Sequence, residues 1–96
     1  MKFESLNDDN ATIEHAIIYL RELFEHHDES NADIAYKMAA VVSCKNFEKW
    51  REDEDFDDLF SIIGGLELSD NNKEKRRQQW NNVGQLIVKL THHYLV

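Results

Sequence analysis

The sequence predicts an all-α fold, a small antiparallel four-helix bundle. Three observations lead to this prediction. The 96 residues include no proline and three glycines, so the turn residues that β-hairpins need are scarce. Apolar residues recur at intervals of three and four, the spacing of one helix face. Short polar stretches separate four such segments, which favours antiparallel neighbours.

The length suits one domain over residues 1–96, with a single hydrophobic core. A short extra helix around Phe3 and Leu6 is compatible with the pattern. The four main helices are expected at roughly residues 11–27, 31–50, 55–64 and 71–94.

One apolar stripe defines the first helix. It consists of Ile13, Ala16, Ile17, Leu20, Leu23 and Phe24. The second helix follows Ser30, which fits a capping signal, and carries apolar side chains nearly all round. Such a helix is usually central in a fold.

Aspartates and glycines bound the third helix. Asp55 and Asp58 are expected to cap its start, and Gly64 with Gly65 to end it through a left-handed cap. The fourth helix follows the capping signal at Asn71. Its stripe is the most regular in the chain and consists of Trp80, Val83, Ile87, Leu90 and Tyr94.

Composition limits the classes of partner. The net charge of -8 disfavours direct binding to nucleic acid, because phosphate contacts depend on Lys and Arg. The longest uncharged apolar stretch, residues 38–42, is far too short to cross a membrane. Residues 1–10 lack the apolar core of a signal peptide, and Cys44 has no partner for an internal disulfide. We therefore expect a cytoplasmic protein.

No metal, cofactor or catalytic group is expected. The five histidines lack the spacing of a bundle metal site, and the pairs at residues 26–27 and 92–93 are expected to cap helix C-termini instead. The acidic runs lack the glycine and glutamate positions of a calcium loop. Cys44 lies in an apolar segment, where a thiol is an inert core residue. The sequence therefore predicts a protein that is not an enzyme.

Charge is concentrated in residues 51–58, which hold six carboxylates and one arginine, or -5 of the total -8. Capping accounts for two of these acids, and the others repel one another. Trp50 precedes the run and is expected to be half exposed, as binding hot spots often are. The candidate partner-binding residues are Trp50, Glu52, Asp53, Glu54, Asp55 and Asp57.

These residues predict a small acidic module that binds a basic protein surface, such as that of a nucleic-acid-binding protein or a toxin. Such a module acts as an inhibitor or an immunity-type protein. The alternative is an oligomerising helical adaptor or structural subunit that uses Ile18, Trp50 and the second helix. A metal-using enzyme is the third hypothesis. The sequence also leaves open homo-oligomerisation, and an acidic run that is only a solvated connection.

Overall fold

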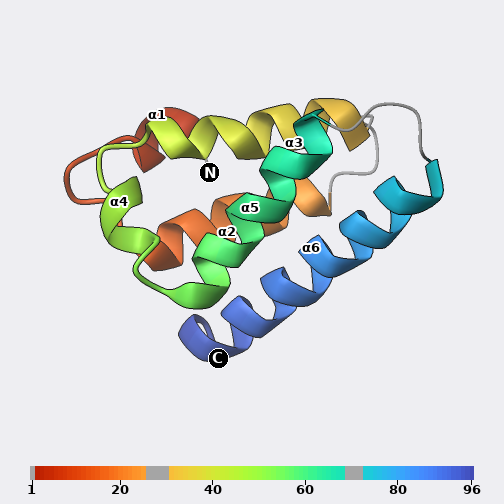
Figure 1. Cartoon of the computed structure of the whole chain (residues 1–96). Coiled ribbons are helices and arrows are strands. Elements are labelled where there is room, and N and C mark those ends of the chain that lie inside the picture. Colours follow the sequence, from red (N-terminus) through yellow and green to blue (C-terminus); the bar gives the residue numbers. More distant parts are fainter. Residues whose placement is uncertain (1, 26–30, 69–72) are drawn as a thin grey trace.

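The computed structural model describes residues 2–25, 31–68 and 73–96, and these residues form helices and no β-strand. The all-α prediction is confirmed. The elements, in chain order, are α1 (Phe3–Leu6), α2 (Ile13–Phe24), α3 (Asn31–Ala39), the 3-10 helix η1 (Ala40–Ser43), α4 (Phe47–Trp50), α5 (Glu54–Leu68) and α6 (Lys73–Tyr94) (Figure 1).

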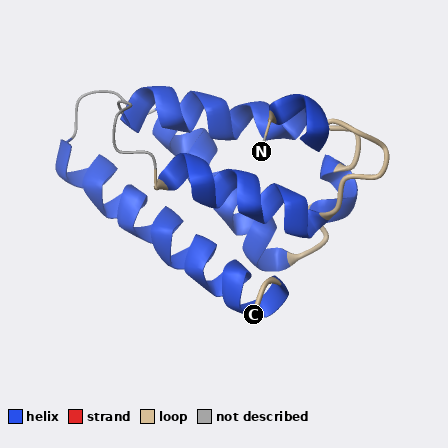
Figure 2. Ribbon diagram, turned by 180° about the vertical axis from the view of Figure 1, so that it is seen from behind, coloured by secondary structure: helices blue, strands red, loops and turns tan. Residues whose placement is uncertain are grey.

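Four of these helices make the body of the molecule. α5 packs against α3 and α6, and α2 packs against the same two helices. The short helix α1 lies on α2. Figure 2 shows the arrangement from behind, with the long α6 along one side of the other helices. The fold is compact, with a radius of gyration of 12.7 Å.

The core is apolar, and none of the described buried residues is charged or polar. Its most enclosed side chains are Phe56, Leu6, Ile17, Leu20, Met38, Leu59, Ile63, Leu66, Leu90, Val41 and Val83. Aromatic rings fill the region where α4 meets α5. Phe60 lies 5.0 Å from both Phe47 and Phe56, measured between ring centroids. Aromatic pairs at this spacing add stability beyond the area they bury.

The extra N-terminal helix is confirmed as α1. Leu6 is fully buried, and the ring of Phe3 lies 6.1 Å from that of Tyr19 on α2. Two apolar side chains in one turn of helix therefore attach the start of the chain to the core.

Helix α2 begins later than predicted, at Ile13, because Thr12 and His15 form a reciprocal cap. The Thr12 hydroxyl accepts from the backbone N–H of His15 at 3.3 Å, and His15 Nδ1 accepts from the backbone N–H of Thr12 at 3.0 Å. Histidine takes the place that glutamate or glutamine usually has in this motif. The predicted end at residue 27 and the capping residues Ser30 and Asn71 lie outside the described residues.

The prediction of one continuous helix over residues 31–50 is wrong. The chain tightens into η1, and Cys44 is extended, with φ of -67° and ψ of 146°. Polar side chains satisfy the backbone around this break: Ser43 Oγ donates to the carbonyl of Ala40 at 2.7 Å, and Asn7 Oδ1 accepts from the backbone N–H of Lys45 at 3.1 Å. Side chains of this kind compete with helical hydrogen bonds.

The thiol of Cys44 lies at this break and is buried. Desolvation raises its pKa above the ordinary value.

The predicted bounds of the third helix are also wrong. α5 continues through Gly64 and Gly65 to Leu68, and no described glycine has a positive φ. The physical reason is that helical continuation buries Leu66, which is 2% exposed. Burial of a leucine offsets the roughly 1 kcal/mol that each helical glycine costs.

Helix α6 agrees with its prediction within the described residues. Trp80, Val83, Ile87 and Leu90 are buried. Among the described helices, none is long and apolar enough to cross a membrane.

Substitution of the α5 glycines tests the helical continuation. Gly64→Ala and Gly65→Ala should each stabilise the protein by about 0.5–1 kcal/mol, because alanine favours helix and, apart from the adjacent residues and the nearby backbone of α5 itself, no described atom lies within 4 Å of the added Cβ. Gly84→Ala is the contrast, because its Cβ would lie 2.9 Å from Phe24 Cζ and the ring would have to move. Denaturant unfolding measures all three. Destabilisation by both α5 variants would contradict the continuous helix.

Removal of Trp80 tests the α6 stripe. Trp80 is 9% exposed, and its ring lies 5.7 Å from that of Phe24. Trp80→Ala should destabilise by about 3–5 kcal/mol through the cavity it leaves. Trp80→Phe should cost less, because Trp80 Nε1 has no hydrogen-bond partner in the described part of the chain. A loss under about 1 kcal/mol for Trp80→Ala, the range of ordinary surface changes, would contradict the core assignment.

Candidate functional site

The acidic run begins with a carboxylate that has two structural partners. Asp53 Oδ1 accepts from the backbone N–H of Asp55 at 2.9 Å and of Phe56 at 3.2 Å, which caps α5. Asp53 Oδ2 accepts from the Tyr94 hydroxyl on α6 at 2.5 Å. The predicted capping by Asp55 and Asp58 is therefore wrong, because the helix starts at Glu54 and Asp53 occupies the capping position.

These contacts shift both pKa values. Desolvation alone would raise the pKa of Asp53, but the hydrogen bonds from Tyr94, Phe56 and Asp55 and the positive potential of His93 together lower it. The hydrogen bond to Asp53, followed by desolvation, raises the pKa of Tyr94 from 10.0 to about 12. The pair is thus most stable with Asp53 ionised and Tyr94 protonated.

Two further acids of the run form ion pairs. Asp55 Oδ1 lies 3.2 Å from Lys89 Nζ on α6. Asp57 Oδ1 lies 3.2 Å from Arg51 Nε, and the same guanidinium lies 3.5 Å from Glu48. The Arg51 and Lys89 side chains are 46% and 66% exposed, so each ion pair contributes little stability but compensates one negative charge.

The remaining acids are Glu52, Glu54 and Asp58, which we call the acidic surface. Each is exposed, and none of them has a cation or hydrogen-bond partner among residues 2–25, 31–68 and 73–96. Within the described part of the chain, three of the six carboxylates in the run therefore have partners and three have none. Glu52 and Glu54 belong to the predicted site, whereas the prediction left out Asp58.

Trp50 is 4% exposed, so the expectation that it is half exposed is wrong. The single turn of α4 directs it inward, and its ring lies 6.2 Å from that of Phe56, edge to face. Its indole N–H donates to no described residue. Trp80 Nε1 is the one fully enclosed side-chain polar atom without a partner in the described part of the chain, so Trp50 Nε1 is still reached by solvent.

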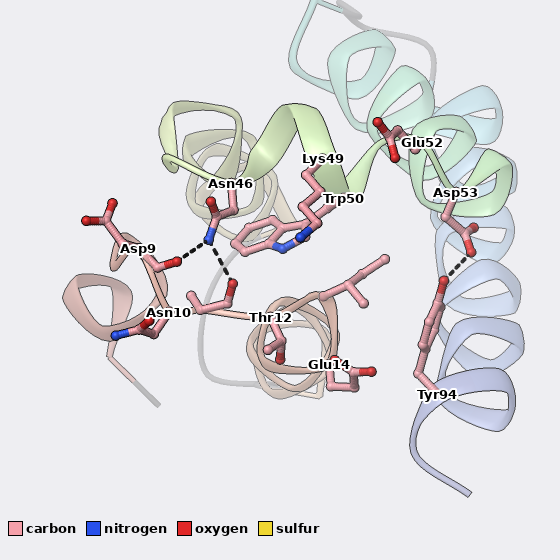
Figure 3. Close-up of a pocket in the computed structure, with 12 residues that line it drawn as sticks. Asp9, Asn10, Thr12, Glu14, Asn46, Lys49, Trp50, Glu52, Asp53 and Tyr94 are labelled. Atoms are coloured by element: carbon pink, nitrogen blue, oxygen red, sulfur yellow. Dashed lines mark hydrogen bonds between the residues drawn. The ribbon is translucent and has the colours of Figure 1, made fainter.

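A depression of about 600 Å³ lies beside Trp50. The segment Asp9–Glu14 forms one wall, α4 and the following turn form another, and Tyr94 of α6 closes the third side (Figure 3). The lining residues are Asp9, Asn10, Ala11, Thr12, Ile13, Glu14, Asn46, Lys49, Trp50, Glu52, Asp53 and Tyr94. Four carboxylates and one ammonium group therefore line it.

Asn46 fixes two walls of the depression relative to each other. Its Nδ2 donates to the carbonyl of Ala11 at 2.9 Å and to that of Asp9 at 3.0 Å (Figure 3). Asp9 also lies 3.6 Å from Lys45 Nζ. The Asp53–Tyr94 hydrogen bond holds the third side, so hydrogen bonds within the protein join all three walls.

The structure brings Trp50, Glu52 and Asp53 to this depression and places Glu54, Asp55 and Asp57 outside it. Sequence reasoning missed Glu14 and Tyr94, which reach the depression from other helices. Their positions in the helical pattern gave no signal of this, because only the tertiary packing of α2 and α6 brings them there.

Other candidate centres are separate from the depression or incomplete. The described histidines are His15, in the α2 cap, and the exposed His92 and His93 in the last turn of α6. No group of three or more metal-ligating side chains occurs among the described residues.

Comparison with protein-family models, curated proteins and solved structures finds no significant match.

The Asp53–Tyr94 hydrogen bond predicts a pH-dependent stability. Tyr94→Phe should cost about 1–2 kcal/mol near neutral pH, because it leaves a charged acceptor without its donor. The raised pKa of Tyr94 gives stability that is present below about pH 10 and lost as pH rises toward 12. The lowered pKa of Asp53 gives stability that is lost as pH falls below about 4.

The stability difference between wild type and Tyr94→Phe should therefore be largest between about pH 5 and 9 and shrink on both sides. Denaturant unfolding across this range measures it. Tyr36→Phe is the control, because Tyr36 is 70% exposed and should give a small, flat difference. A flat profile for Tyr94→Phe would show that the hydrogen bond does not form in solution.

Proposed function

We propose that this protein is a small acidic binding module that recognises a basic surface of another protein, and that it inhibits or neutralises that partner. The partner is a protein with a positively charged face, such as a nucleic-acid-binding protein or a toxin. The module itself contacts neither nucleic acid nor membrane, performs no catalysis and works in the cytoplasm.

The observation that carries the proposal is the acidic surface, formed by Glu52, Glu54 and Asp58. These exposed carboxylates have no partner among the described residues, although their neighbours Asp55 and Asp57 are paired with cations. Like charges held close together repel, so a basic partner surface would relieve a cost that the free protein bears. Such charge also accelerates association through long-range steering.

The scaffold we propose for this surface is an antiparallel four-helix bundle made of α2, α3, α5 and α6. Its support is that each of these helices packs against two others, and that neighbours run in opposite directions in Figure 1. Glu54 and Asp58 of the acidic surface lie in the first turns of α5, and Glu52 lies in the turn before it, at the end of the bundle that also holds the end of α6.

The second candidate function is a homo-oligomerising adaptor. One observation favours it: Tyr36 on α3 is 70% exposed and Val42 in η1 is 54% exposed. The burial of Trp50 removes it as a surface anchor for such an interface, and Ile18 is half-buried. A concentration-dependent dimer that Tyr36→Ser disrupts would favour the adaptor over the binding module.

Neutralisation of the acidic surface tests the binding module. A triple variant with Glu52→Gln, Glu54→Gln and Asp58→Asn should fold with unchanged or slightly higher stability, because repulsion is removed. Its association with a basic partner captured from the native host should be slower and much less dependent on salt, since exposed charges are screened over about 8 Å at physiological ionic strength. Stopped-flow association at low and high salt measures both effects.

The matched control removes three negative charges at the other end of α2 and α6, by Glu22→Gln, Glu25→Gln and Glu74→Gln. It should retain most of the association rate and its salt dependence. If the two triple variants associate equally fast, net charge alone governs binding, and the acidic surface has no specific role.

A further inference from the structure

We propose that the start of α2 is a pH-dependent cap, in which protonation of His15 releases the backbone N–H of Thr12 and loosens one wall of the depression. The inference goes beyond the proposed function and does not depend on it. It follows from the role that a histidine ring nitrogen must take in this cap.

The first argument is the direction of the hydrogen bond. The backbone N–H of Thr12 donates to His15 Nδ1 at 3.0 Å. A ring nitrogen accepts only when it carries no proton, so the cap requires a neutral imidazole with its proton on Nε2. Glutamate and glutamine, the usual residues at this position of a capping box, keep an acceptor oxygen between about pH 5 and 8. Histidine loses its acceptor within that range.

The second argument is what a proton on Nδ1 does to this geometry. The Thr12 hydroxyl oxygen lies 3.1 Å from His15 Nδ1 and is able to accept from it, but the Thr12 backbone N–H then faces another N–H and has no acceptor. The new positive charge also lies at the N-terminal end of α2, where the helix dipole disfavours cations. Both effects oppose the proton, so the capped state favours the neutral ring.

Nearby acids act in the opposite direction. The residues that share a small hollow with His15 come from α1 and the segment after it, and Asp8 is the charged residue among them. Glu14 precedes His15 on α2. Asp8 is exposed and already accepts from the backbone N–H of Asn10 at 2.9 Å, and neither acid forms an ion pair with His15 in the described part of the chain. Solvent screens their attraction, so the loss of the acceptor dominates.

The cap belongs to one wall of the depression, and Thr12 is part of the lining (Figure 3). Asn46 holds the neighbouring carbonyls of Asp9 and Ala11 whatever the pH, because a carboxamide does not titrate. Protonation of His15 therefore loosens the first turn of α2 and leaves the earlier part of the wall attached. The stability that the cap supplies is present above about pH 7 and lost as the pH falls toward 5.

The test compares the wild type with His15→Gln, which keeps an acceptor for the Thr12 N–H and does not titrate. Denaturant unfolding gives the equilibrium constant of both proteins at about pH 8 and pH 5. The two constants should agree within about twofold at the higher pH. At the lower pH the wild type should have an unfolding constant about two- to fivefold larger than the variant. The other ionisable groups are the same in both proteins and cancel from the comparison.

NMR of ¹⁵N-labelled protein locates the effect. At about pH 8 the His15 ring should carry its proton on Nε2, and the Thr12 amide signal should move as this ring gains its second proton. In His15→Gln the Thr12 signal should move much less. His93→Gln removes an exposed histidine from the last turn of α6, and it should leave the movement of the Thr12 signal unchanged.

Four results would each overturn the inference. They are a proton on His15 Nδ1 at the higher pH, a Thr12 signal that moves equally in His15→Gln, an identical pH dependence of unfolding in wild type and His15→Gln, and a wild type that gains stability relative to the variant at the lower pH. The last result would show that attraction by Asp8 and Glu14 outweighs the lost acceptor.

Discussion

The carboxylate of Asp53 makes the contacts that join α5 and α6 at the end of the molecule where the depression lies. One oxygen starts α5, and the other holds Tyr94 in the last turn of α6. The nearby Asp55 forms an ion pair with Lys89, which is also on α6. The two helices are therefore joined at the end where the depression lies. Because the ionised form accepts all three hydrogen bonds, protonation of one group weakens the α5 cap and the α6 contact together.

Much of the fold was predictable because the spacing of apolar residues along the chain marks the buried face of a helix whatever the helix packs against. The all-α class, the α6 stripe and the short α1 follow from it. Helix bounds were less predictable, because several signals compete at each end. Asp53, Asp55 and Asp58 are all suitable caps, and Asp53, which forms the cap, also accepts a hydrogen bond from Tyr94, 41 residues away. Gly64 and Gly65 signal a helix end, yet burial of Leu66 carries the helix past them.

The sequence predicted the concentration of negative charge at the candidate site, but it did not predict the depression or the partners of the individual acids. The sequence placed six acids together, but it could not say which of them find cations. Arg51 lies within the run, whereas Lys89 is brought to Asp55 by the packing of α6. The exposure of Trp50 was predicted wrongly for a related reason. A continuous helix over residues 31–50 would have ended at Trp50, next to the acidic run, and left its ring partly exposed. The break at residues 44–46 turns α4, so that the ring packs on Phe56.

The break itself has a consequence for the redox chemistry of the protein. Cys44 is the single cysteine and is buried at the point where η1 gives way to α4. Oxidants and other thiols react with the thiolate, and burial disfavours both its formation and its access. Two molecules can therefore become linked through this sulfur only after the segment has opened. The rate at which an alkylating reagent labels Cys44 thus reports how often this junction unfolds while the rest of the chain stays native.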